Sequence, residues 1–405
     1  MVQDAKNNVA VINVGIWYLF KTFFKIGLVS FGGHMALLAV VQREMVDKDK
    51  TLDNEVVLDA ISIASLLPGP LAVNVVTYVG YYLSGKKGAL ISLLAILLPA
   101  CLLMLGLSYL YFSYGYNYKA NQAMYFVIGV VGSIILSTGL LFFKKEVLGN
   151  VFKLLLCVLA IIIQVIFKSY FITIGLVILG GIAGVLFNIG NADVSSQSKF
   201  NFNSNFSTKA TLVLLSGIAL LFVSNTARYI ESIYLKIAVI FSGISISLFG
   251  GGYVMIPIMQ SLFVNELQWL NQQEFVDAIA FSQITPGPIL VSATFIGYKL
   301  AGIFGACIAT LAIFIPSAAL MIVISGVFRE NRNHYLLKNI LAGIKPVVIG
   351  LIIAAGIEIL LKVHPDFLLI AITIIAFVLN FKYKVSPVYL ILASIFLGVI
   401  LKVYL

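Results

Sequence analysis

Long apolar runs, separated by short polar stretches, constrain this chain more than any other feature. Some of these runs reach the roughly 20 residues that a helix needs to cross a bilayer, and others are shorter. In lipid only helices and closed barrels satisfy every backbone polar group, and the runs are too long for barrel strands. We therefore predict an all-α polytopic protein that crosses the cell membrane many times. The thirteen runs lie at 12–42, 56–83, 88–114, 122–143, 151–167, 170–189, 210–224, 234–260, 275–300, 301–328, 339–361, 366–381 and 385–403.

The composition agrees with a membrane protein, because 61% of the 405 residues are hydrophobic and only 10% are charged. So few charges do not cover a soluble domain of this size. The net charge of +10 is what basic loops beside membrane helices produce as topology signals, so we expect a lipid bilayer as partner and no nucleic acid. The basic residues are nearly balanced between the two sides of thirteen spans, which leaves the orientation open. The cysteines stand alone in apolar runs, and we expect no metal and no cofactor.

The chain contains two copies of one unit. Phe31-Gly32-Gly33 returns 218 residues later as Phe249-Gly250-Gly251, and Pro68-Gly69-Pro70 returns at the same offset as Pro286-Gly287-Pro288. "VGYYLSGKKGA" and "IGYKLAGIFGA" follow in the same order at an offset of 217. Apolar sequence of low complexity does not reproduce such motifs in order, so we infer a duplication. We place the repeats at residues 1–190 and 210–405, joined by a polar linker rich in serine and asparagine at 191–209.

The two repeats are expected to be inverted. In the series of apolar runs, the first element of copy one and its match in copy two are seven elements apart. An odd displacement places equivalent helices in opposite directions across the membrane, as in many secondary transporters. A single re-entrant segment would reverse this parity.

Each copy carries two helix breakers inside apolar sequence, FGG and PGP. Glycine frees the backbone, the first proline disfavours helix in the residue before it, and the second suits the first position of a new helix. Such breaks survive in lipid only where protein or a wet cavity satisfies the exposed backbone groups. The N-terminus of the restarted half-helix suits an oxyanion. One break alone would indicate a proline kink or a close helix crossing, but two matched pairs favour a shared central site.

These breaks define our candidate substrate-binding residues. Lys345 joins them because an ionisable residue inside a run of spanning length marks a functional site by default. The hydroxyl and amide side chains in the set either donate to an anion or cap the broken helix ends. The candidates are Gly32, Gly33, Pro68, Gly69, Pro70, Asn74, Gly250, Gly251, Gly252, Gln283, Thr285, Pro286, Gly287, Pro288, Ser292 and Lys345.

Asp59 and Asp277 each lie nine residues before a PGP motif and are the ion-coupling candidates. An acid beside an anion path carries a coupling proton or pairs with a lysine, whereas an acid near a helix start lies at the headgroups. The sequence leaves these alternatives open.

The motifs argue against other classes of protein. No GxxxxGK[ST] loop is present, so the driving force is expected to be an ion gradient or exchange and not ATP hydrolysis. Three scattered histidines without an HExxH motif argue against an intramembrane enzyme acting on a lipid phosphate, and we expect no catalytic residues. An anion channel stays open as an alternative.

These residues resemble the chromate ion transporter family. Copy two carries the resemblance in "FGGGYVMIPIMQ", "EFVDAIAFSQITPGP", "ATFIGYKLAGIFGA" and Pro316-Ser317, and copy one more loosely in "FGGHMALLAVVQREMV" and "LLPGP". The resemblance implies a secondary carrier of chromate or a related tetrahedral oxyanion such as sulfate. Some members are single-repeat proteins that work as pairs, whereas this chain has the fused two-repeat form, and a homodimer of it is left open. His34 and Leu67 depart from the pattern, so the site is expected to be asymmetric.

Overall fold

The structure is a computed structural model that describes residues 14–30, 34–114, 124–190, 230–247, 252–331, 335–363 and 366–404. Every regular element within these ranges is helical, which confirms the predicted fold class. The polar linker expected at 191–209 and the run at 210–224 lie outside the described residues.

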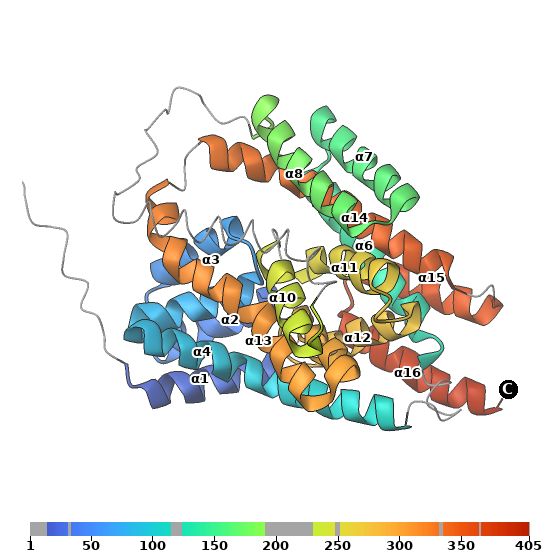
Figure 1. Cartoon of the computed structure of the whole chain (residues 1–405), viewed down its shortest axis with the longest axis horizontal. Helices are drawn as coiled ribbons and strands as arrows, with labels where there is room; N and C mark the ends of the chain where they lie inside the picture. Colours follow the sequence, from blue (N-terminus) through green and yellow to red (C-terminus); the bar gives the residue numbers. More distant parts are fainter. Residues whose placement is uncertain are drawn as a thin grey trace, which may run out of the picture.

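The described helices of copy one precede the linker (Figure 1). They are α1 (Ile16–Val29), α2 (His34–Val41), the π-helical turn η1 (Gln42–Lys48), α3 (Asn54–Leu66), α4 (Leu71–Tyr114), α6 (Val127–Glu146), α7 (Val151–Phe167) and α8 (Tyr170–Leu186).

Copy two repeats this order after the linker. Its elements are α10 (Ile233–Ile246), η3 (Gly252–Val254), α11 (Met255–Met259), the π-helical turn η4 (Gln260–Glu266), α12 (Gln272–Ile284), η5 (Ile289–Val291), α13 (Ser292–Asn331), α14 (Tyr335–Leu361), α15 (Phe367–Phe381) and α16 (Pro387–Tyr404).

The duplication read from the sequence is repeated in the element bounds. Helix α3 and helix α12 both have 13 residues, and both ends of α12 lie 218 positions after those of α3. The π-helical turns η1 and η4 correspond in the same way, each with 7 residues. The two segments therefore adopt the same local structure over equivalent residues.

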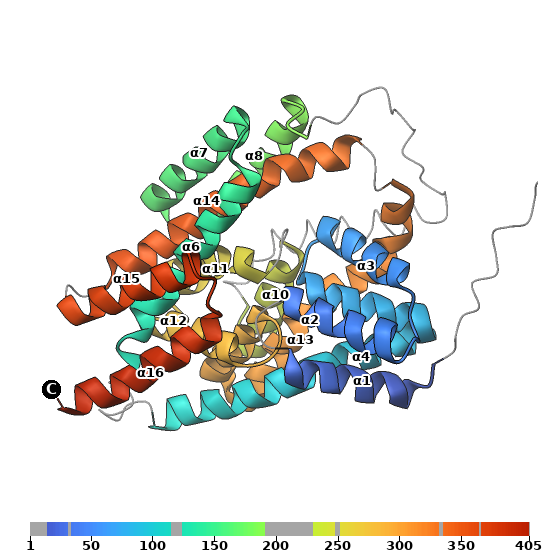
Figure 2. The ribbon, with the colours of Figure 1, turned by 180° about the vertical axis from the view of Figure 1, so that it is seen from behind.

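The two copies run in opposite directions. After its reversal at Gly85, the long arm of α4 runs from left to right in Figure 1, while the arm of α13 after Gly302 runs from below the centre to the upper left. Figure 2 shows the same opposition from behind. Helices α6 and α14 also pack antiparallel, since Gly132 contacts Leu360 and Gly139 contacts Ile353. These directions are those of inverted repeats.

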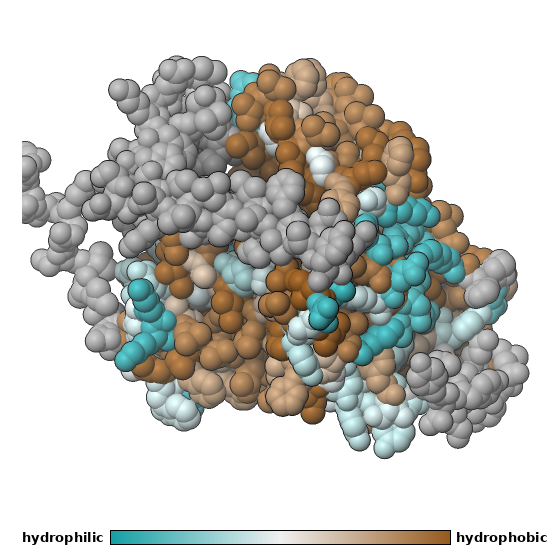
Figure 3. All heavy atoms as spheres, viewed as in Figure 1, coloured by the Kyte–Doolittle hydropathy of each residue, from teal (hydrophilic) through white to brown (hydrophobic). Residues whose placement is uncertain are grey.

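Four described helices are long and apolar enough to span a bilayer, fewer than the thirteen runs in the sequence. They are Leu71–Tyr114, Val127–Glu146, Ile289–Val323 and Lys338–Leu361. Five further apolar helices are shorter. Figure 3 shows apolar surface over α7 and α8 and over α4 and α13, with hydrophilic residues gathered over η4 and α12. The broad apolar surface is what lipid contact requires.

Long helices α4 and α13 are each two helices joined by a tight reversal. Ser84 and Gly85 have φ/ψ of −146/26 and 61/−153, and Ala301 and Gly302 have −151/30 and 60/−150. Only glycine adopts the positive φ without strain. The helix arms then cross closely, since a Cβ on Gly88 would lie 2.2 Å from the carbonyl oxygen of Gly80. Gly305 and Gly297 repeat this crossing in copy two, at 2.3 Å.

We predict that Gly88→Leu destabilises the protein, because the new side chain must separate the two arms at a backbone contact. Overpacking of this kind costs about 1–3 kcal/mol or more. Gly106→Leu is the matched control, since it adds the same side chain to the same helix where a Cβ meets nothing within 4 Å. Thermal unfolding in detergent measures both, and equal melting temperatures would contradict the close crossing.

Candidate functional site

The PGP motifs interrupt the helices in the same way in both copies. Leu67 and Thr285, just before the motifs, are extended at φ/ψ of −95/151 and −71/144. Gly69 and Gly287 follow with φ of 112° and 114°. Both motifs are buried, and helix resumes at Leu71 and Ile289. The second proline therefore lies one residue before the new helix. The sequence had suggested the first position of that helix instead.

Each break packs against the other repeat. A Cβ on Gly69 would lie 2.2 Å from Cβ of Ser317 in α13, and one on Gly287 would lie 3.0 Å from Cβ of Ala100 in α4. Ala100 and Ser317 are equivalent positions, each following a helix proline. The two breaks and the two proline-bearing helices thus form a reciprocal arrangement around the pseudo-twofold axis.

Helix length separates this arrangement from the reversals in α4 and α13. About 15 residues separate each break from the reversal at Gly85 or Gly302, and a similar stretch separates that reversal from Ala100 or Ser317. At 1.5 Å per residue this is roughly 22 Å, about half of a bilayer with its headgroups.

Protein groups satisfy several backbone atoms at the breaks. The Gly287 N–H donates to the Ser30 carbonyl of copy one at 2.9 Å. Asn74 Nδ2 donates to the Pro68 carbonyl at 3.1 Å, and the Thr285 hydroxyl donates to the Ser282 carbonyl at 3.2 Å. These three contacts satisfy backbone groups at the breaks, which is the capping role that the sequence left open beside anion binding.

Two buried polar atoms beside the breaks lack a hydrogen-bond partner among the described residues. They are Oδ1 of Asn74 and Oγ of Ser292, and both side chains are 0% exposed. A buried polar atom without a partner is costly, and such atoms mark places where water or a ligand binds. One lies next to each PGP motif.

The glycine motifs are described only in part. Gly32, Gly33, Gly250 and Gly251 lie outside the described residues, whereas Gly252 begins η3. Tyr253, the next residue, shares a hydrogen bond with Gln283 of α12, with Gln283 Nε2 3.2 Å from its hydroxyl. The glycine segment and the PGP motif of copy two are thereby tied together.

The two coupling candidates lie in different environments. Asp277 is buried at 1% exposure, and its carboxylate accepts from Tyr111 at 2.8 Å and from Gln273 at 2.9 Å. Tyr111 belongs to α4, so this contact joins the two repeats. Asp59 is half-buried. Among the described residues Asp277 is hydrogen-bonded to Tyr111 and Gln273 and not paired with a lysine.

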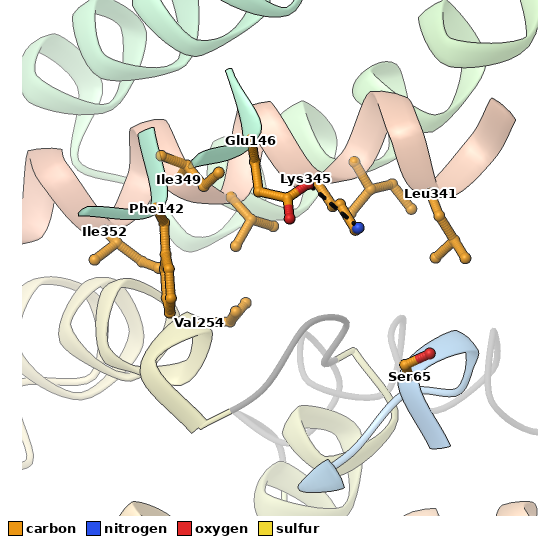
Figure 4. Close-up of a pocket in the computed structure, with 10 residues that line it drawn as sticks. Ser65, Phe142, Glu146, Val254, Leu341, Lys345, Ile349 and Ile352 are labelled. Carbon is orange, nitrogen blue, oxygen red and sulfur yellow. Dashed lines mark hydrogen bonds and ion pairs between the residues drawn. The ribbon is translucent and has the colours of Figure 1, made fainter. Parts of the chain in front are cut away.

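Lys345 lies apart from the breaks, level with the end of α6. Its Nζ is 3.4 Å from Oε2 of Glu146, the last residue of that helix. The side chain is 55% exposed and lines a cavity of about 150 Å³. Figure 4 shows this pair facing Ser65 and Val254 across the cavity.

Sequence reasoning missed the partners that come from the other repeat. Tyr111 and Ala100 carry no motif that points to Asp277 or Gly287, and they contact them only because the repeats interlock. The sequence signal for Glu146 was limited to its place in a short charged stretch after an apolar run. Within the described residues no group of three or more His, Cys, Asp or Glu side chains could hold a metal ion.

Inverted repeats with interrupted helices meeting at the centre define a multi-pass membrane transporter of the two-repeat class. The chromate transporter family profile matches residues 17–185 and 235–399, and the chain belongs to this family. It is 31% identical, over 98% of this chain and 96% of the relative, to an uncharacterized transporter of Methanocaldococcus jannaschii.

Two further relatives are informative. The chain is 28% identical to a chromate transport protein of Cupriavidus metallidurans, over 90% of this chain and 88% of the relative. An uncharacterized transporter of Bacillus subtilis is 30% identical over 39% of this chain and 90% of its own length, so it corresponds to about one repeat. No solved structure matches the chain.

We predict that Gly69→Ala destabilises the protein more than Gly287→Ala. Both add a Cβ at positive φ, but only the first meets a side chain at 2.2 Å. Adding Ser317→Gly to Gly69→Ala should restore part of the melting temperature, because it removes the Ser317 Cβ that the new methyl group would meet. Melting curves of the two single variants and the pair measure this, and lack of rescue would contradict the cross-repeat contact.

Proposed function

We propose that this protein is a secondary active carrier of chromate or a related tetrahedral oxyanion such as sulfate, working by exchange or ion coupling. Family membership supports the substrate class, and the relative from Cupriavidus metallidurans is named for chromate transport. The observation that carries a carrier mechanism is the reciprocal packing of each PGP break on the other repeat. Two inverted halves that meet at such breaks can rock against one another around a central site.

Of the two buried atoms without a partner, the Ser292 hydroxyl can donate to an anion on a path through this centre, whereas Oδ1 of Asn74 accepts and suits a water or another donor. Asn74 and Ser292 lie at the restarted half-helices, whose N-termini carry positive partial charge. The amide of Asn74 and the hydroxyl of Ser292 also carry donor hydrogens, and a hydroxyl rotates to suit its partner. An oxyanion passing between the breaks would find both groups within the first turn of each half-helix.

Asp277 is the proposed coupling residue. It is buried, its carboxylate accepts hydrogen bonds from two neutral side chains, and one of these, Tyr111, comes from the opposite repeat. A charge in such a place is expensive unless it is paired, so the carboxyl is suited to gain and lose a proton as its surroundings change. A movement between the repeats would alter the Tyr111 contact directly.

Uptake by proteoliposomes tests the carrier proposal. Purified protein should accumulate labelled chromate or sulfate, and unlabelled anion inside the vesicles should accelerate uptake through counterflow. Conductance without counterflow would identify a channel. Appearance of a cleaved phosphate product from added lipid phosphate would indicate an enzyme, and either outcome would overturn the proposal.

We predict that Asp277→Asn abolishes the dependence of uptake on a pH gradient while leaving counterflow exchange active. The amide keeps the shape of the carboxyl and one acceptor oxygen for Gln273, its NH2 can donate to the Tyr111 hydroxyl, and it does not titrate. Asp59→Asn is the matched control, because it makes the same change at the equivalent, half-buried position of copy one. Uptake by the Asp277 variant that still responds to the gradient would eliminate this residue as the coupling group.

A further inference from the structure

The cavity beside Lys345 brings a cation next to the interrupted segments of both repeats. Ser65 lies three residues before Pro68, and Val254 lies two residues after Gly252. Its volume of about 150 Å³ is several times the roughly 10–15 Å³ that one water needs. The cavity therefore has room for a small hydrated ion.

The cavity lies at the end of the candidate span Val127–Glu146. Glu146 is the last residue of α6, and α14 passes it in the antiparallel direction. Lys144 and Lys145 occupy the same final turn and are exposed. Basic residues at this level raise the local concentration of anions before they reach the cavity.

The charged pair within the cavity is loosely held. Lys345 and Glu146 are the charged side chains among its lining residues, and their atoms are 3.4 Å apart with 55% and 33% of the side chains exposed. An exposed pair of this kind contributes little to stability. A lysine ammonium has three donors, so two remain for another acceptor while Glu146 holds one.

The equivalent place in the other half lacks these features. The register that pairs Gly132 with Gly350 pairs Val127 with Lys345, and Val127 is 0% exposed. Ser65 is equivalent to Gln283, which is already bonded to Tyr253. Inverted repeats relate the two sides of the membrane, and among the described residues Lys345 has no basic counterpart at the equivalent position.

We propose that this cavity is a one-sided vestibule for a divalent tetrahedral oxyanion, in which Lys345 binds the anion and Glu146 competes for Lys345 when the vestibule is empty. The inference rests on the proposed oxyanion transport and adds to it a first binding step on one face. The anion displaces Glu146 from Lys345 and then passes between Ser65 and Val254 toward the breaks.

Sulfate and chromate binding to the purified protein, followed by calorimetry, tests the vestibule directly. Lys345→Gln should weaken binding about tenfold, the change expected for losing one charge-assisted hydrogen bond. Glu146→Gln should tighten binding about two- to fivefold, because it removes the competitor at an exposed pair. Lys299→Gln, which removes a lysine paired with Glu274 away from the cavity, is the control and should bind as the wild type. Wild-type binding by Lys345→Gln, or weaker binding by Glu146→Gln, would overturn the proposal.

The sidedness is tested by thiol labelling of Lys345→Cys and Val127→Cys in a Cys307→Ser background, since Cys307 is the exposed cysteine in the described part of the chain. A membrane-impermeant maleimide should label position 345 from one membrane face and leave position 127 unlabelled from both. Labelling of position 345 from both faces, or equal labelling of the two positions, would contradict a one-sided vestibule. Absence of transport by the wild type would overturn the proposed function, while calorimetry and labelling would still decide the vestibule.

Discussion

The structure depends on satisfying the backbone N–H and C=O groups that interrupted helices would leave unpaired in lipid. At each PGP motif the buried chain gives up helical hydrogen bonds, and in lipid an unsatisfied backbone group costs several kcal/mol. Copy one satisfies one of these groups in copy two, since the Ser30 carbonyl accepts a hydrogen bond from the Gly287 N–H. The glycines leave room for the helices after Pro99 and Pro316, since a Cβ on Gly69 or Gly287 would lie 2.2 or 3.0 Å from them. The helix breaks therefore require the two repeats to pack against each other.

The two halves share a backbone but differ in the side chains around it. Ser317 faces the break of copy one, and Ala100 faces the break of copy two. Asp277 is enclosed by Tyr111 and Gln273, whereas Asp59 is half-buried. Lys345 has Val127 as its equivalent. Conserved geometry together with divergent polar groups allows a transporter to present unlike surfaces to its two sides while moving by one mechanism.

Much of this fold could be predicted from the sequence because its signals are local or repeated. Apolar run length fixed the helical class, and the FGG and PGP motifs revealed the duplication and the breaks. The odd displacement of the copies gave the opposite directions of α4 and α13. The apolar runs did not give the number of spans, since several of them form helices shorter than 18 residues.

The site was harder to predict, because its contacts join residues far apart in the chain. Tyr111 and Asp277 are separated by 166 positions, and Lys345 and Glu146 by 199. No periodicity in the sequence relates such pairs; they follow from how two inverted repeats pack. Asn74 and Ser292 could be placed near the breaks, but whether their polar atoms cap the backbone or stay unpaired depends on atomic positions.

Fusion of the repeats has an evolutionary consequence at Ala100 and Ser317. A half-length protein that assembles as a symmetric pair must carry the same residue at this position in both partners, so any change alters both breaks at once. Joining the copies in one chain removes that restriction and lets selection act on each face separately. Serine beside one break and alanine beside the other is a combination that only a fused chain, or two different half-length partners, can hold.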